Sequence, residues 1–146
     1  MVTVVFRFSS IYGFGRKKTS VNLILDKIMK DETVKVTGDG NQTRDFTYVS
    51  DVAEALCMAV ENKFPSGEDA IYDIGTGITT TLNDLMLVMG LLLKKKANIE
   101  HIASNAADPK RNALNVSKAE MFGFKAKVSL TEGLKKLIDE ETKCQK

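Results

Sequence analysis

The sequence feature that most restricts the fold is the stretch from Gly38 to Asp51, which reads GDGNQTRDFTYVSD. Residues 34–37 before it are mostly β-branched and predict a strand. Glycine adopts positive φ without strain, and Asp and Asn tolerate it, so residues 38–41 predict a turn. Residues 46–49 predict a second short strand, and a helical pattern follows. The stretch therefore predicts a glycine hairpin that leads into a helix.

Arg44 and Asp45 stand directly after this turn. The planar guanidinium of an arginine donates two hydrogen bonds to one anion, so Arg44 beside a glycine turn suits a phosphate. The alternative is a solvated Arg44–Asp45 ion pair, because exposed pairs are common and contribute only about 0–1 kcal/mol. The spacing alone leaves both interpretations open.

The composition indicates one soluble globular domain. The chain has 146 residues, of which 43% are hydrophobic and 27% charged. This length and composition suffice for a hydrophobic core that needs no disulfides or metal ions for stability. A net charge of +2 argues against a nucleic-acid partner. The single histidine, His101, has no partner cluster, and Cys57 and Cys144 lack metal spacing, so we expect no metal site. We expect a cytoplasmic location and no membrane association, since the sequence shows no signal peptide or long apolar span.

Three further segments predict strands. Val2–Phe8 is almost continuously apolar or β-branched, which is typical of a parallel strand buried on both faces. Ala70–Ile74 predicts another strand, ended by a tight strand-to-helix turn at Gly75-Thr76-Gly77. A third is Asn98–Ile102. Ligands of open α/β sheets bind beyond the carboxyl ends of strands, so residues 9–15 are a candidate site.

Capping residues followed by apolar stripes predict five helices. The expected caps are Ser20, Asp51, Thr81, Ser117 and Ser129. Small and aliphatic residues form the stripe of the second helix, with Cys57 on the same apolar face: Val52, Ala55, Leu56, Ala59 and Val60. After residue 139 the chain becomes polar, so we expect 140–146 to be a frayed tail.

The pattern Gly38-Asp-Gly-x-x-x-Arg44-Asp-Phe-x-x-Val-x-Asp51 resembles the nucleotide-sugar epimerases and dehydratases of the extended short-chain dehydrogenase/reductase family, typified by UDP-glucose 4-epimerase. Segments with the same resemblance occur in the family's order: Arg7–Gly13, Asp73–Gly77 and Asn115–Ala119. The resemblance covers almost the whole chain and matches only the second half of such an enzyme.

This resemblance implies an α/β fold: the last strands of a Rossmann-like parallel sheet plus a small mixed α/β substrate-binding lobe. Residues 1–139 would form this C-terminal half, with residues 1–15 and 45–77 contributing Rossmann-sheet elements, and residues 140–146 a polar tail. The complete enzyme would be an NAD-dependent isomerase acting on a UDP- or dTDP-hexose.

The resemblance also implies a set of substrate-binding residues: Arg44, Ser10, Tyr12, Asp108, Arg111 and Val36. Arg44 would bind the diphosphate, Ser10 and Tyr12 would lie near the sugar or the cofactor edge, and the segment at residue 108 would close over the nucleotide.

Two positions depart from the family pattern. Ser10 replaces an asparagine that contacts the sugar, and Asn105 aligns with an arginine that grips the diphosphate. Either Arg111 or Lys110 substitutes for that arginine, or the phosphate affinity is lower, by about 1.5–3 kcal/mol for one lost charge-assisted contact.

The family's catalytic elements are not found in this sequence. NAD binding needs a glycine-rich turn after the first strand, and catalysis needs a Tyr-x-x-x-Lys pair. The residues four positions after the three tyrosines are Arg16, Val52 and Thr76, so no such pair occurs. Whether the chain alone is an enzyme is therefore left open.

Three hypotheses follow. The chain is the nucleotide-sugar-binding half of an epimerase that needs a cofactor half, or it is a stand-alone nucleotide-sugar-binding module, or it is a degenerate assembly protein that kept the fold and lost the site. An apolar strand at 2–8 without neighbours would expose backbone edges, so we also expect a homodimer or an obligate partner.

Overall fold

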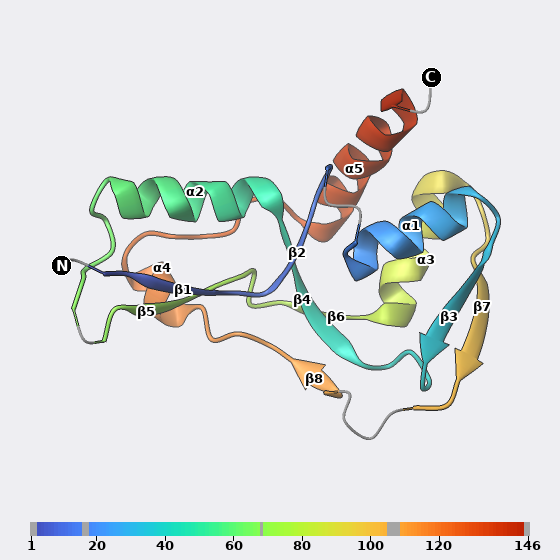
Figure 1. Ribbon diagram of the computed structural model, residues 1–146, viewed down its shortest axis with the longest axis horizontal. Helices are drawn as coiled ribbons and strands as arrows, with labels where there is room; N and C mark the ends of the chain where they lie inside the picture. The colour runs from blue at the N-terminus through green and yellow to red at the C-terminus, as the bar shows by residue number, and fades with distance from the viewer. Residues whose placement is uncertain (1–2, 16–17, 68, 105–108, 145–146) are drawn as a thin grey trace.

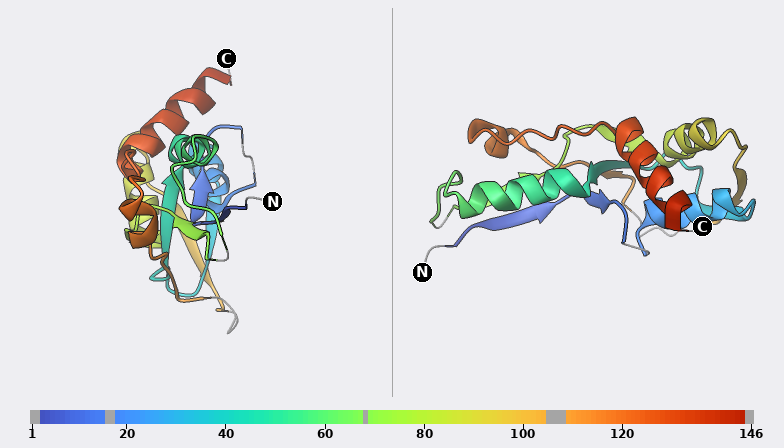
Figure 2. Two further views of the ribbon diagram at one scale, coloured as in Figure 1. Left: turned by 90° about the vertical axis from the view of Figure 1, so that its left-hand side faces the viewer. Right: turned by 90° about the horizontal axis from the view of Figure 1, so that it is seen from above.

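The computed structural model describes residues 3–15, 18–67, 69–104 and 109–144. The chain is elongated, and two groups of strands and helices follow one another along its long axis (Figures 1 and 2). Helices alternate with parallel strand pairs, which confirms the predicted α/β class.

Each end of the molecule contains one pair of parallel strands (Figure 1). Strand β1 (Val5–Phe8) pairs with β5 (Ile71–Ile74) at one end. Strand β3 (Thr33–Thr37) pairs with β7 (Asn98–Ile102) at the other. Strands that are far apart in the sequence are thus neighbours in space.

Strand β4 (Thr43–Tyr48) lies between these two ends and is the centre of a four-stranded sheet. Its second half pairs in parallel with β2 (Ser10–Tyr12). Its first half pairs with β6 (Thr79–Thr81), which is antiparallel, and with β8 (Arg111–Asn112), which is parallel.

The helices are α1 (Ser20–Met29), α2 (Val49–Val60), α3 (Leu82–Leu93), α4 (Ser117–Met121) and α5 (Leu130–Cys144). Helix α2 runs alongside the β1–β5 pair, and α1 and α3 lie beside the β3–β7 pair (Figures 1 and 2). None of the helices in the described part of the chain is both long and apolar enough to span a membrane.

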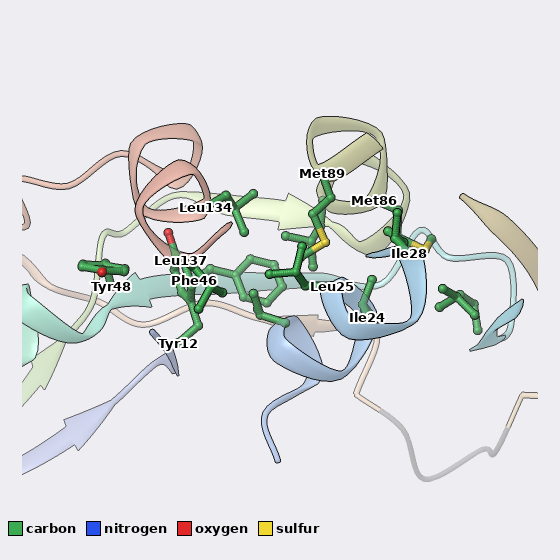
Figure 3. Packing of buried hydrophobic residues seen from close by; sticks show 14 residues of the cluster. Tyr12, Ile24, Leu25, Ile28, Phe46, Tyr48, Met86, Met89, Leu134 and Leu137 are labelled. Atoms are coloured by element: carbon green, nitrogen blue, oxygen red, sulfur yellow. The ribbon is translucent and has the colours of Figure 1, made fainter. Parts of the chain in front are cut away.

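Two hydrophobic clusters fill these two ends. The larger one joins α1, β3, β4, α3 and α5, and Figure 3 shows Leu25, Phe46, Met89 and Leu134 converging in it. We call the elements α1, β3, β7, α3 and α5 the lobe. The smaller cluster includes Ala55, Tyr72 and Phe124. We call the elements β1, β5, α2 and α4 the sheet region.

Two predicted helix starts are confirmed. Thr81 caps α3, since its hydroxyl accepts from the Asp84 N–H at 2.9 Å. Ser129 and Glu132 form the capping box of α5, with the Ser129 N–H 3.1 Å from the Glu132 carboxylate and the Glu132 N–H 3.3 Å from the Ser129 hydroxyl. These interactions are local, so the sequence pattern identifies them directly.

Three predicted caps are wrong. Thr19, not Ser20, caps α1 by accepting from the Asn22 N–H. Helix α2 begins at Val49, so Asp51 lies in its first turn, where its carboxylate accepts from the Val128 N–H at 3.1 Å. Helix α4 begins at Ser117, so its N-cap position is Val116, whose side chain makes no capping hydrogen bond. Asp51 therefore has a tertiary partner, which a local pattern does not reveal.

The predicted hairpin is also wrong. The strands on either side of the glycine turn, β3 and β4, do not pair with each other, because β3 pairs with β7 and β4 pairs with β2, β6 and β8. In addition, the Gly75–Gly77 turn leads into β6 before α3 begins, not directly into a helix. Helix α5 continues to Cys144, where we expected the chain to fray after residue 139.

Burial in the sheet region differs from the prediction. Strand β1 is not buried on both faces, since Val5 is 45% exposed and only β5 pairs with it among the described residues. On α2, Leu56 is 48% exposed and Val60 83%, and Cys57 is exposed too. The helix does bury Val52 and Ala55 of the predicted stripe, together with Met58, which the stripe did not include. Periodicity identified apolar positions but not which of them would be covered.

Candidate functional site

A cavity of about 710 Å³ lies between α1, β3 and the glycine turn, a volume typical of small-molecule sites. Its lining residues come from α1, β3, the turn, the start of β4 and the segments near residues 104 and 110: Ser20, Leu23, Ile24, Lys27, Val34, Lys35, Val36, Thr37, Gly38, Asp39, Asn41, Gln42, Arg44, Leu82, Ser104, Pro109 and Lys110. Four of these residues are cationic and one is anionic, so the described lining favours an anionic ligand.

Contacts from outside the turn hold its shape. Gly38 and Gly40 have φ of 73° and 76°, the left-handed region that glycine adopts without strain. The Asn83 side chain donates to the Asp39 carbonyl at 3.0 Å, and its position leaves no room for a Cβ at Gly40. His101 Nδ1 lies 2.7 Å from the Gly38 carbonyl oxygen. This wall of the cavity is therefore fixed by α3 and β7.

The Asp39 carboxylate remains an anion at this wall. Its oxygens accept from the backbone N–H of Asn41 at 3.0 Å and from the Asn41 side chain at 2.9 Å. Both hydrogen bonds favour the charged form and lower the pKa of Asp39 below its ordinary value. The cavity thus has one negative group on its turn side.

The Arg44 guanidinium is half-buried at the edge of the cavity. Its Nη1 donates to the carbonyls of Thr43 at 2.8 Å and Pro109 at 2.9 Å. Among the described residues, its Nε and Nη2 groups have no hydrogen-bond acceptor. An arginine held by one nitrogen keeps a two-donor edge, and that edge matches two oxygens of one phosphate.

Arg44 and Asp45 do not form an ion pair in the described structure. Successive side chains of a strand point to opposite faces of the sheet. The Asp45 side chain therefore lies on the face of β4 opposite to Arg44, where it is 1% exposed. Its carboxylate accepts from the N–H groups of Thr76 and Gly77 at 3.0–3.1 Å and from the Thr76 hydroxyl at 2.6 Å. This excludes the solvated pair that the spacing had left open.

The structure brings together some of the residues implied by the resemblance. Val36 and Arg44 line the cavity, and so does Lys110, whereas Arg111 lies on β8 opposite Thr43 and is not part of the lining. Asp108 and Asn105 lie outside the described residues.

Ser10 and Tyr12 lie on β2, outside this cavity. Ser10 is half-buried opposite Phe46, two residues beyond Arg44 on the neighbouring strand. Tyr12 is only 1% exposed, and its hydroxyl donates to the Leu130 carbonyl at 3.3 Å. Burial raises the pKa of Tyr12 well above its ordinary value. In this chain Tyr12 is a core residue (Figure 3).

Sequence reasoning missed several lining residues. Leu23 and Lys27 are four positions apart on α1 and face the cavity beside the buried stripe. Gln42 lines it from the turn, where its side chain donates to the Thr37 carbonyl at 2.8 Å. Leu23 is 49% exposed, which the sequence pattern does not reveal.

The fold and the cavity together describe an α/β protein with a cavity whose described charged lining residues are mainly cationic. The chain belongs to the NAD-dependent epimerase/dehydratase family, whose model matches residues 1–75. The UDP-glucuronate 4-epimerase of Thermodesulfobacterium geofontis is 30% identical over 137 residues, which cover 92% of this chain and 42% of that protein. The predicted family is thereby confirmed.

Solved structures agree with this assignment. The UDP-glucose 4-epimerase of Thermotoga maritima with UDP-glucose has a TM-score of 0.88 at 28% identity, covering 100% of this chain and 48% of that one. A mutant UDP-glucuronic acid 4-epimerase of Bacillus cereus, in complex with UDP-4-deoxy-4-fluoro-glucuronic acid and NAD, has a TM-score of 0.87 at 27% identity, covering 97% and 45%. The chain thus spans less than half the length of these relatives.

The family depends on NAD, as the resemblance implied. A dinucleotide's pyrophosphate is usually bound by free N–H groups of a glycine-rich turn. The Gly75–Gly77 turn of this chain follows a strand, but the N–H groups of Thr76 and Gly77 already donate to Asp45. This turn therefore does not fit the pyrophosphate of NAD.

Proposed function

We propose that this chain is the nucleotide-sugar-binding half of an NAD-dependent sugar epimerase that acts on a UDP- or dTDP-hexose. The NAD site and the Tyr-x-x-x-Lys pair are supplied by an NAD-binding half, which acts with this one in the cytoplasm. The chain alone binds the substrate but does not turn it over.

The observation that carries this proposal is the two-donor edge of Arg44 at the cavity. Two carbonyls, of Thr43 and Pro109, hold its Nη1, so the rest of the guanidinium is oriented before a ligand arrives. A preoriented donor loses less conformational entropy on binding. With Lys27, Lys35 and Lys110 also in the lining, a diphosphate is the ligand group that this charge distribution fits best.

The sheet region supports the need for a partner. Val5 and Ile71 are paired neighbours, 45% and 44% exposed on one face of the β1–β5 pair. Parallel sheets are normally covered on both faces, and a strand with one neighbour leaves its other edge unpaired. An NAD-binding half that adds a parallel strand beside β1 and covers α2 would satisfy both requirements. A second copy of this chain is the alternative partner.

The proposal is tested by titrating the chain with UDP, UDP-glucose and dTDP, by calorimetry or by NMR. We expect saturable binding that Arg44→Ala weakens about 10- to 100-fold, because one charge-assisted phosphate contact contributes about 1.5–3 kcal/mol. Arg111→Ala is the matched control, since this arginine lies one strand away and outside the lining. Absence of binding, or equal losses in the two variants, would refute the proposal.

A stand-alone binding module is the second candidate, and one observation favours it. Residues of this chain suffice to form a cavity of about 710 Å³. The two candidates differ when the NAD-binding half of a relative is added. Epimerase activity appearing only in the mixture supports the proposed half-enzyme, whereas UDP binding without complex formation supports the module.

A further inference from the structure

Asp45 is a buried residue that does not line the cavity and has no role in the proposed ligand binding so far. It lies next to Arg44 on β4 and is 1% exposed, and among the described residues its carboxylate accepts side-chain and backbone hydrogen bonds only from the turn after β5. Both carboxylate oxygens accept from backbone N–H groups, Oδ1 from Thr76 and Oδ2 from Thr76 and Gly77. Hydrogen bonds to a charged acceptor are stronger than neutral ones and more demanding in geometry.

The turn that donates these hydrogen bonds is shaped around the Asp45 carboxylate. A Cβ at Gly75 would lie 2.5 Å from Asp45 Oδ2 and 3.2 Å from the Ser9 Cβ, so only glycine fits. Gly77 has a φ of 71°, which aims its N–H toward Asp45 in a conformation that other residues rarely adopt. The small space at Gly75 and the positive φ of Gly77 therefore restrict how the Asp45 carboxylate and the turn can be placed relative to each other.

This contact joins the two regions of the molecule. Asp45 belongs to the four-stranded sheet, whereas the turn leaves β5 of the sheet region. A second contact lies alongside, where the hydroxyls of Ser9 and Thr47 are 2.5 Å apart. The carboxylate therefore fixes β4 relative to the ends of β1 and β5.

Fixing residue 45 on one face of β4 also fixes residue 44 on the other. Side chains alternate along a strand, and a shift of one residue would turn Arg44 away from the cavity. Arg44 is held from the side by the Pro109 carbonyl, but its backbone position depends on β4. Pairing of Arg44 with Thr80 on β6 and with Asn112 on β8 sets its backbone register, and the Asp45 carboxylate adds a side-chain anchor one residue further along β4.

We propose that Asp45 is a positioning residue, which anchors β4 to the Gly75–Gly77 turn so that Arg44 presents its two-donor edge to the cavity. This inference rests on the proposed function, because it assumes that the cavity receives the diphosphate. Asp45 touches no ligand in this arrangement and acts only through Arg44.

The test is Asp45→Asn, which keeps the volume but places an NH₂ group against an N–H of Thr76 or Gly77. We expect the dissociation constant of UDP to rise at least tenfold while that of uridine changes less than twofold. Asp51→Asn is the matched control: Asp51 is also buried and also accepts a backbone N–H, from Val128, but follows β4 at its far end. We expect it to leave the ratio of UDP to uridine affinity unchanged.

A double variant separates positioning from general destabilisation. Arg44→Ala with Asp45→Asn should bind UDP no more weakly than Arg44→Ala alone, because both changes remove the same contact. Additive losses, or equal losses of UDP and uridine affinity in Asp45→Asn, would overturn the inference. Thr76→Val, which removes one donor to Asp45, should give a smaller loss of UDP affinity in the same direction, and serves if Asp45→Asn does not fold.

The ligand-free chain offers a reading that does not depend on the proposed function. In NMR spectra of the wild-type chain, we expect the chemical shift of the Arg44 Nε–H group to differ from that of an exposed arginine such as Arg111. In Asp45→Asn, we expect this chemical shift to move toward that of Arg111. If wild-type chain does not bind UDP, the proposed function fails, and this signal still decides the positioning role. An unmoved signal would refute it.

Discussion

The lobe and the sheet region use the same kinds of elements with different results. In the lobe, α1, α3 and α5 bury Leu25, Leu85 and Leu134 in one cluster, and α1, β3 and the start of α3 contribute to the lining of a cavity. In the sheet region, β1 has one neighbour in the described structure, and apolar residues of α2 remain exposed. The lobe thus contains a cavity within its own elements, whereas the sheet region leaves one strand with a single neighbour and apolar side chains exposed.

The largest expected effect is on stability, and it tests whether the hydrophobic cluster of the lobe stabilises the fold. Leu85→Ala removes a fully buried side chain of α3, and we expect a loss of about 2–5 kcal/mol in the free energy of unfolding. Leu87→Ala is the matched control, since it changes the same residue type two positions away, where the side chain is 61% exposed. Urea unfolding gives both values. Similar losses in the two variants would show that the core is not organised as described.

An intermediate effect is expected at Tyr12, on β2 between the two regions. Tyr12→Phe removes the hydrogen bond to the Leu130 carbonyl, and we expect a loss of about 0.5–1.5 kcal/mol. The folded chain favours the neutral phenol, so this stabilisation is present below the pKa of an unfolded tyrosine, near 10. It is lost as the pH rises above that value toward the higher folded pKa.

The pH dependence of stability tests whether burial raises the pKa of Tyr12. Stability measured from pH 8 to 11 should fall less steeply in Tyr12→Phe than in the wild-type chain. The same slope in both would mean that Tyr12 does not titrate as its burial requires.

The smallest effect on stability is expected on α2, where the comparison concerns association. Val60→Glu changes an 83% exposed side chain, so the free energy of unfolding should change by less than about 0.5 kcal/mol. Sedimentation equilibrium, alone and with an NAD-binding half, should show association weakened at least tenfold. Met121→Glu, at an 80% exposed position on α4, is the control. Unchanged association in Val60→Glu would remove α2 from the proposed contact surface.

The sequence alone determined the features that depend on neighbouring residues. The apolar spacing of α1 from Val21 to Ile28, the Thr81 cap and the Ser129–Glu132 capping box occur where the pattern predicted them. The family assignment also followed from an ordered set of short motifs around Arg44. Each of these features needs only residues a few positions apart, which the sequence shows directly.

Tertiary structure alone decided which elements became neighbours. Pairing β3 with β7 instead of β4, the contact of Asp45 with the Gly75–Gly77 turn and the burial of Tyr12 all depend on segments 30 or more residues away. Local periodicity marks a face as apolar or polar, but the face is buried only where a distant segment packs against it. The sequence pattern therefore did not predict the cavity, although it did single out residues that line it, including Val36 and Arg44.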